Sequence, residues 1–79
     1  MERYRNLGGD SGVEAYALGD SCIAVRFSSG AIYWYTEASV GPVHVAEMTR
    51  LARCGKGLST YISTHPDVSA GYARKSPDD

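Results

Sequence analysis

Apolar and β-branched side chains alternate through two adjoining segments in the middle of the chain, residues 22–27 and 31–35. In the first segment one stripe is apolar, and the other carries Arg26, which marks the side exposed to water because arginine is rarely buried unpaired. In the second segment both stripes are apolar, so the pattern does not decide which one is buried. A Ser29-Gly30 turn joins the two segments, since glycine tolerates the backbone angles of tight turns. The pattern therefore predicts a β-hairpin.

The register of this hairpin has two alternatives. A two-residue turn places Ile32 and Trp34 on the face of Val25. A three-residue turn with a bulge shifts the pairing by one residue and turns Tyr33 and Tyr35 inward instead. Because a shift of one residue moves every side chain to the other face, the register decides which aromatic rings face solvent.

The flanking segments extend the hairpin into a layered fold. Residues 13–18 read as a further strand, and the cluster Gly19-Asp20-Ser21 reads as a turn. A helix is predicted from Pro42 to about Arg53, with apolar residues three and four apart and Gly55 as its stop. A shorter helix follows, from Ser59 to about Thr64. We therefore expect an α+β fold, β-β-β-α-α, in which a three-stranded antiparallel meander carries two helices on one face.

The chain ends are expected to lie outside this fold. Residues 1–12 are polar and rich in glycine and read as a flexible arm. Residues 65–79 hold small residues, proline and a terminal Asp-Asp pair, and read as a disordered tail. The predicted domain is residues 13–64.

Composition excludes several classes of protein. The 79 residues suffice for one domain with a small core and leave little room for a deep catalytic cleft. The formal charge of −1 gives no overall signature of nucleic-acid binding. Two cysteines do not form a disulfide framework, and there is no apolar run long enough for a membrane span and no secretory signal. A cytoplasmic location without a membrane contact is the default expectation.

Several of these features occur together in one known family. Along the chain come a strand with Ile23, Val25 and Phe27, a Ser-Gly turn, Tyr33-Trp34-Tyr35, a helix that starts with proline and the glycine-rich joint 55–62. This order resembles the KTSC domain. That small domain occurs alone in bacteria and at the C-terminus of some lysyl-tRNA synthetases. Its mark is a Tyr-x-Tyr motif, which residues 33 and 35 match here. Trp34 occupies a middle position that is usually polar, and Gly41 separates Val40 from Pro42 where the family commonly has Val-Pro.

The resemblance bears on both the register and the function. A polar middle residue implies that the two tyrosines of the motif face inward, which favours the bulged register and leaves Trp34 outside with Ile32, Ala24 and Arg26. The synthetase context of the family suggests RNA binding.

The candidate binding residues fall into two groups. An aromatic ring on an open sheet beside an arginine is a platform on which unpaired bases stack. A small basic cluster at the end of the first helix could contact phosphate, although an ordinary solvated helix face explains it as well. The residues predicted for RNA binding are Trp34, Arg26, Tyr33, Tyr35, Arg50, Arg53 and Lys56. The same open face could instead bind a protein partner or a second copy of the chain, and the two tyrosines could be core residues.

Other chemistry finds less support. Cys54 could pair with His44 or His65 as a nucleophile and base, but a small thiol with surface histidines is the simpler reading. No short pair of ligands indicates zinc, and Gly55-Lys56-Gly57 lacks the spacing of a phosphate-binding loop. We therefore expect a small non-catalytic binding domain without a metal or cofactor.

Overall fold

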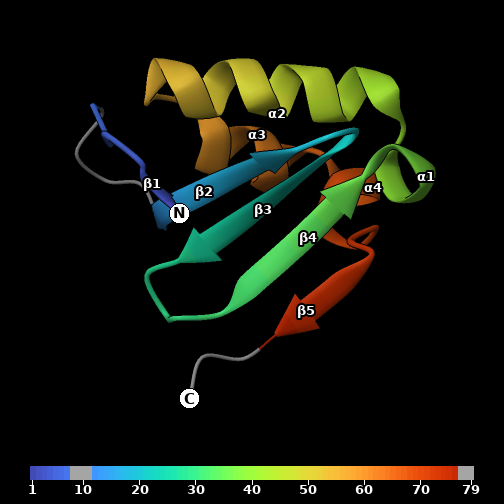
Figure 1. Ribbon diagram of the computed structural model, residues 1–79, viewed down its shortest axis with the longest axis horizontal. Helices are drawn as coiled ribbons and strands as arrows, with labels where there is room; N and C mark the ends of the chain where they lie inside the picture. Colours follow the sequence, from blue (N-terminus) through green and yellow to red (C-terminus); the bar gives the residue numbers. More distant parts are fainter. Residues whose placement is uncertain (8–11, 77–79) are drawn as a thin grey trace.

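An antiparallel sheet is the layer on which the molecule is built (Figure 1). The computed structural model describes residues 1–7 and 12–76. Within these residues five strands lie side by side in the order of the sequence. They are β1 (Glu2–Arg3), β2 (Val13–Gly19), β3 (Cys22–Phe27), β4 (Ile32–Thr36) and β5 (Arg74–Ser76). The expected antiparallel α+β fold is present, but the expected three-stranded meander is only the centre of a wider sheet.

Four helices between β4 and β5 form the second layer of the described chain. They are α1 (Glu37–Val40), α2 (Pro42–Cys54), α3 (Leu58–Thr64) and α4 (Pro66–Ser69). In Figure 1, α3 and α4 lie behind the sheet and α2 runs along its upper border. The near face of the sheet carries no helix in this view.

Local sequence sets the limits of these helices. Thr36 caps α1, because its hydroxyl accepts the Ser39 N–H at 3.0 Å while the Ser39 hydroxyl accepts the Thr36 N–H at 2.9 Å. Pro42 starts α2, and Gly55 ends it in the left-handed conformation, as predicted. The next helix, α3, starts at Leu58, one residue before the predicted Ser59, and its cap residue Gly57 makes no side-chain hydrogen bond.

The turn between β3 and β4 fixes the register of the central hairpin. Phe27 N–H donates to the Ala31 carbonyl at 2.9 Å, and Gly30 within the loop has a φ of 96°. A three-residue loop that ends on a residue with positive φ is a common bulged hairpin connection. Ile23 consequently pairs with Tyr35, and Ala24 pairs with Trp34. This is the bulged register, one of the two alternatives that the sequence left open.

The core lies between the sheet and the helices. Tyr35 and Ile23 contribute from the sheet, with 1% and 0% of their surface exposed, and Met48 of α2 packs against them with 0% exposed. The other buried members of the cluster are Tyr4, Val13, Tyr16, Val25, Ala52, Leu58, Ile62 and Val68. Every sheet residue of this cluster from β2 to β4 belongs to the same face, so the helices cover that face alone.

Residues 1–7 and 65–76 belong to the fold, which corrects the expected arm and tail over these residues. Tyr4 follows β1, is 3% exposed, and its hydroxyl accepts the Leu58 N–H at 3.2 Å. Val68 of α4 is completely buried, and β5 pairs with β4. The parts of the expected arm and tail at 8–11 and 77–79 lie outside the described residues. The described part of the chain has no helix that is long and apolar enough to cross a membrane.

Candidate functional site

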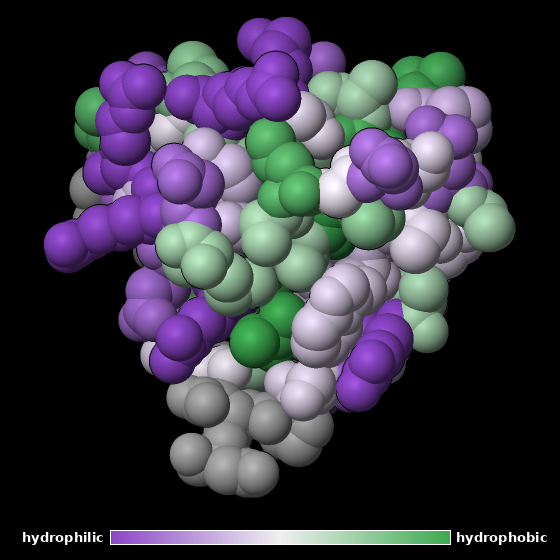
Figure 2. Space-filling model, in the orientation of Figure 1, coloured by the Kyte–Doolittle hydropathy of each residue, from purple (hydrophilic) through white to green (hydrophobic). Residues whose placement is uncertain are grey.

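The candidate site is the sheet face opposite the helices, which we call the open face. Strand pairing places one row across it, formed by Ala17, Ala24, Trp34 and Arg74. A second row holds Arg3, Ala15, Arg26, Ile32 and Ser76. Figure 2 shows this side of the molecule, where apolar and weakly polar side chains run down the middle between hydrophilic ones.

Trp34 is the largest side chain on the open face. It is partly exposed, and small Ala24 is its neighbour on β3. On the other side Arg74 of β5 extends over the indole, with its guanidinium carbon 5.0 Å from the ring centroid. This cation–π contact holds a positive charge beside a flat aromatic surface. The pair forms a small platform that can take a planar group.

Two further arginines lie in the second row. Arg26 of β3 is half-buried and pairs with the exposed Glu14, with Nε 3.2 Å from Oε1. Arg3 is placed on the same face by the pairing of β1 with β2. Three arginines, Arg3, Arg26 and Arg74, thus lie on the open face by register. Glu14, at the bulge of β2, supplies the carboxylate that pairs with Arg26.

The two tyrosines predicted for RNA binding lie on the other side of the sheet. Tyr35 is part of the core, and burial raises the pKa of its hydroxyl far above the usual range. Tyr33 packs edge-on against Phe27 and Tyr72, with ring centroids 5.3 and 4.9 Å apart, and a hydrogen bond to Tyr33 raises the pKa of Lys75. Neither ring reaches the open face, so stacking by this pair is not part of the site.

The predicted basic cluster at the end of α2 consists of Arg50, Arg53 and Lys56, and these residues differ in whether a carboxylate already binds them. Arg50 is already paired, because its Nε donates to Glu47 Oε1 at 3.0 Å and this bond lowers the pKa of the carboxyl. Arg53 and Lys56 are exposed on either side of Gly55. Only these two remain candidates for contact with an external anion.

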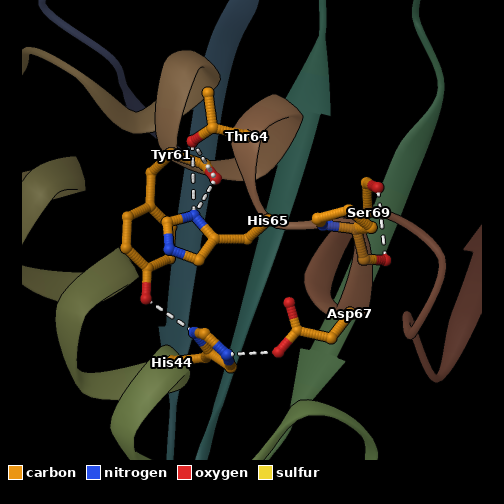
Figure 3. A network of polar contacts seen from close by, with 7 residues as sticks. His44, Tyr61, Thr64, His65, Asp67 and Ser69 are labelled. Carbon is orange, nitrogen blue, oxygen red and sulfur yellow. Dashed lines mark hydrogen bonds and ion pairs between the residues drawn. The ribbon is translucent and has the colours of Figure 1, made fainter.

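A second polar cluster joins the helices on the far side of the sheet (Figure 3). His44 of α2 lies between two partners, with Nε2 2.7 Å from Asp67 Oδ2 and Nδ1 2.6 Å from the Tyr61 hydroxyl. An ionised carboxylate only accepts, so Nε2 of His44 donates to Asp67. His65 stacks on Tyr61 at 4.0 Å and donates from Nδ1 to the Tyr61 carbonyl at 2.7 Å.

The order carboxylate, imidazole and hydroxyl resembles a proton relay, but the site lacks an activated nucleophile. Burial raises the pKa of the Tyr61 hydroxyl, so the phenolate is disfavoured, while the bond from His44 lowers the pKa of Asp67. Each partner comes from a different helix, so the cluster ties α2, α3 and α4 together.

The suggested pairing of Cys54 with a histidine is not seen: both ring nitrogens of His44 bond to Tyr61 and Asp67, and Nδ1 of His65 bonds to the Tyr61 carbonyl. Cys54 ends α2, ten residues beyond His44, which is about 15 Å along a helix. Cys54 and Cys22 are free thiols. Among the described residues no three side chains of the types that bind metals form a cluster.

Arg3 and Arg74 were not among the site residues predicted from the sequence, because they lie in the segments predicted to be an arm and a tail. Both lie in short strands, of two and three residues, with no apolar stripe of their own. No family model matches the chain, and no match was found among curated proteins or solved structures.

Proposed function

We propose that this chain is a non-catalytic domain that binds single-stranded RNA on its open face. The observation that carries the proposal is Trp34, which lies on the face without helices and has the guanidinium of Arg74 over its ring. Bases of any sequence stack on aromatic rings and on guanidinium planes. A base takes its place on the indole, and Arg74, on the exposed edge strand, moves to its other side.

Charge supports a nucleic acid as the ligand. The open face presents Arg3, Arg26 and Arg74 within a protein whose overall charge is slightly negative. Phosphate contacts position a strand and stacked bases add affinity without reading sequence. The binding is therefore tolerant of sequence and weakens as salt rises.

The resemblance to the KTSC domain is part of the same proposal. The inward placement of Tyr33 and Tyr35 agrees with what that resemblance implies. We propose with it that the chain belongs to that family, lies in the cytoplasm and acts without a cofactor.

The first test is a titration with single-stranded RNA. Trp34 is the one tryptophan of the chain, so its fluorescence reports directly on the open face. A mixed-sequence RNA decamer should quench the Trp34 fluorescence, and the quenching should decrease as the salt concentration rises. Absence of quenching at RNA concentrations near 1 mM, roughly the weak end of specific binding, would overturn the proposal.

Variants locate the binding surface. With labelled RNA decamer, Trp34→Ala should weaken binding about 5- to 150-fold, as expected for loss of 1–3 kcal/mol of stacking. Arg74→Ala should weaken it too, whereas the neighbouring Lys75→Ala should not, because Lys75 lies over Tyr33 on the opposite face. Circular dichroism checks the fold of each variant. If Arg74→Ala and Lys75→Ala weakened RNA binding equally, the assignment of the binding surface to the open face would be contradicted.

A second candidate function is self-association or binding of a protein partner through the same face. The observation in its favour is a run of apolar side chains across three strands: Ala15, Ala17, Ile32 and Trp34 are partly exposed, and Ala24 between them is buried. Exposed apolar patches mark protein interfaces. Sedimentation over a range of concentrations tests the homodimer: a mass that stays at 8.5 kDa excludes it, and a doubled mass that Trp34→Ala abolishes supports it.

A further inference from the structure

The segment that follows β1 connects the open face to the end of α2. Arg3 belongs to the open face by register. Two residues later Arg5 lies against the C-terminus of α2, so closely that a side chain at Gly55 would meet the Cβ of Arg5 at 2.7 Å. The Leu7 N–H donates to the Gly55 carbonyl at 2.7 Å and fixes this arrangement. In Figure 1, β1 and the end of α2 occupy the same end of the molecule.

A hollow lies along this segment. Its volume is about 330 Å³, and it is lined by Arg3, Tyr4, Arg5, Asn6, Val13, Glu14 and Ser28. Of these lining residues, Arg3 and Arg5 are exposed. Asn6 adopts a positive φ of 56°, which turns the chain at this point. The hollow therefore offers two guanidinium groups and polar side chains to a ligand that reaches it from the open face.

The charges around the hollow favour an anion. Arg53 and Lys56 flank Gly55 beside Arg5 and add to the positive charge. Glu14 opposes it, but its carboxylate is shared with Arg26 at 3.2 Å. The C-terminal end of α2 carries the negative end of the helix dipole, so an anion here has to be held by side chains and not by the helix.

We propose that the RNA strand whose base stacks on Trp34 continues across the sheet to this hollow, where Arg3 and Arg5 bind successive phosphates. The inference rests on the proposed function. It joins the two parts of the predicted site, the aromatic face and the end of α2, into one track through β1. Arg50, which is held by Glu47, lies outside the track.

The length of the track sets the size of the ligand. From Trp34 on β4 to Arg3 on β1 there are three strand spacings, about 14 Å in all. A stacked strand advances about 3.4 Å per nucleotide, so about five nucleotides reach from the platform to the hollow. Affinity should therefore rise with RNA length up to about five nucleotides, and a dinucleotide should occupy the platform alone.

The experiment compares Arg3→Ala, Arg5→Ala and Arg50→Ala in binding to a labelled mixed-sequence RNA decamer at several salt concentrations. Each phosphate contact contributes about 0.7 to the slope of log K against log salt for a single strand. Loss of one contact should thus lower the slope by about 0.7 and weaken binding about fivefold at 0.1 M salt. Arg50→Ala should match the wild type, and Arg5→Lys should recover the slope of the wild type.

The possible outcomes separate this inference from the proposed function. Dinucleotide binding, followed by Trp34 fluorescence, should be the same in wild type, Arg3→Ala and Arg5→Ala. If the decamer quenches Trp34 while Arg3→Ala and Arg5→Ala keep the slope of the wild type, the track is wrong and the open face stands. If Arg50→Ala weakens RNA binding as much as Arg3→Ala and Arg5→Ala do, the losses reflect the overall charge of the protein, and the track is again wrong. If no RNA quenches Trp34, both proposals fall.

Discussion

Replacing Val68 by alanine tests whether the C-terminal part of the chain belongs to the core. Val68 comes from α4, a helix of only four residues, and is completely buried. The change removes two methyl groups from the contact with the core cluster. If residues 66–69 were the loose tail that the sequence predicted, the same change would cost almost nothing.

The expected magnitude follows from the burial. Two buried carbon groups are worth about 0.8 kcal/mol each in transfer free energy, or about 1.6 kcal/mol together. A residual cavity of up to about 50 Å³ adds at most about 1.2 kcal/mol. We therefore expect the free energy of unfolding to fall by about 2–3 kcal/mol. For a 79-residue domain this is a large part of a total of about 4–12 kcal/mol.

Val43→Ala is the matched control, because Val43 also lies in a helix but is 77% exposed. It should change stability by less than about 0.5 kcal/mol. Urea unfolding followed by circular dichroism measures both variants, and Val68→Ala should also lower the melting temperature by about 8–24 °C. A Val68→Ala protein as stable as Val43→Ala would refute the placement of α4 in the core.

Three further predictions concern polar and backbone features. Because the bond from His44 holds the pKa of Asp67 below its usual value, the ionised carboxylate stabilises the fold above that value and loses this effect as pH falls through the lowered pKa. Asp67→Asn should therefore unfold more easily than wild type near neutral pH, and melting curves recorded down to about pH 2 should converge. Gly71→Ala should cost about 1–3 kcal/mol in urea unfolding, since its Cβ would overlap the Asp67 carbonyl oxygen; wild-type stability would show that the loop yields. Arg50→Ala should leave the melting temperature unchanged, because the pair with Glu47 is exposed to solvent, and a clear drop would mean that the pair has a structural role.

The elements that could be predicted from the sequence are those with their own periodicity. The hairpin of β3 and β4 alternates over a full strand length, and α2 has an apolar stripe with Pro42 and Gly55 as signals at its ends. The stripe consists of Val45, Met48, Leu51 and Ala52, of which Leu51 is half-buried and the other three are buried. In these segments local pattern and tertiary packing agree.

The segments that were missed owe their structure to partners elsewhere in the chain. β5 reads Arg-Lys-Ser, a sequence with no preference for a strand, and it is held by pairing with β4. β1 has only two residues, and the buried ring of Tyr4 anchors the chain that follows it. Local sequence patterns carry no information on contacts with distant parts of the chain. The two short strands, and with them Arg3 and Arg74 of the candidate site, were therefore not predicted.

The position of β5 has a consequence for the dynamics of the free protein. The strand is attached at the edge of the sheet by three residue pairs, after a long excursion of the chain through residues 37–73. Such an edge opens at a cost below that of global unfolding, so the amides that join β5 to β4 should exchange with solvent hydrogen before those between β3 and β4. Each opening takes Arg74 away from Trp34 and bares the hydrogen-bonding edge of β4, the kind of edge along which chains aggregate. A ligand that bridges the two strands would slow this exchange and, by the same contacts, keep the molecules apart.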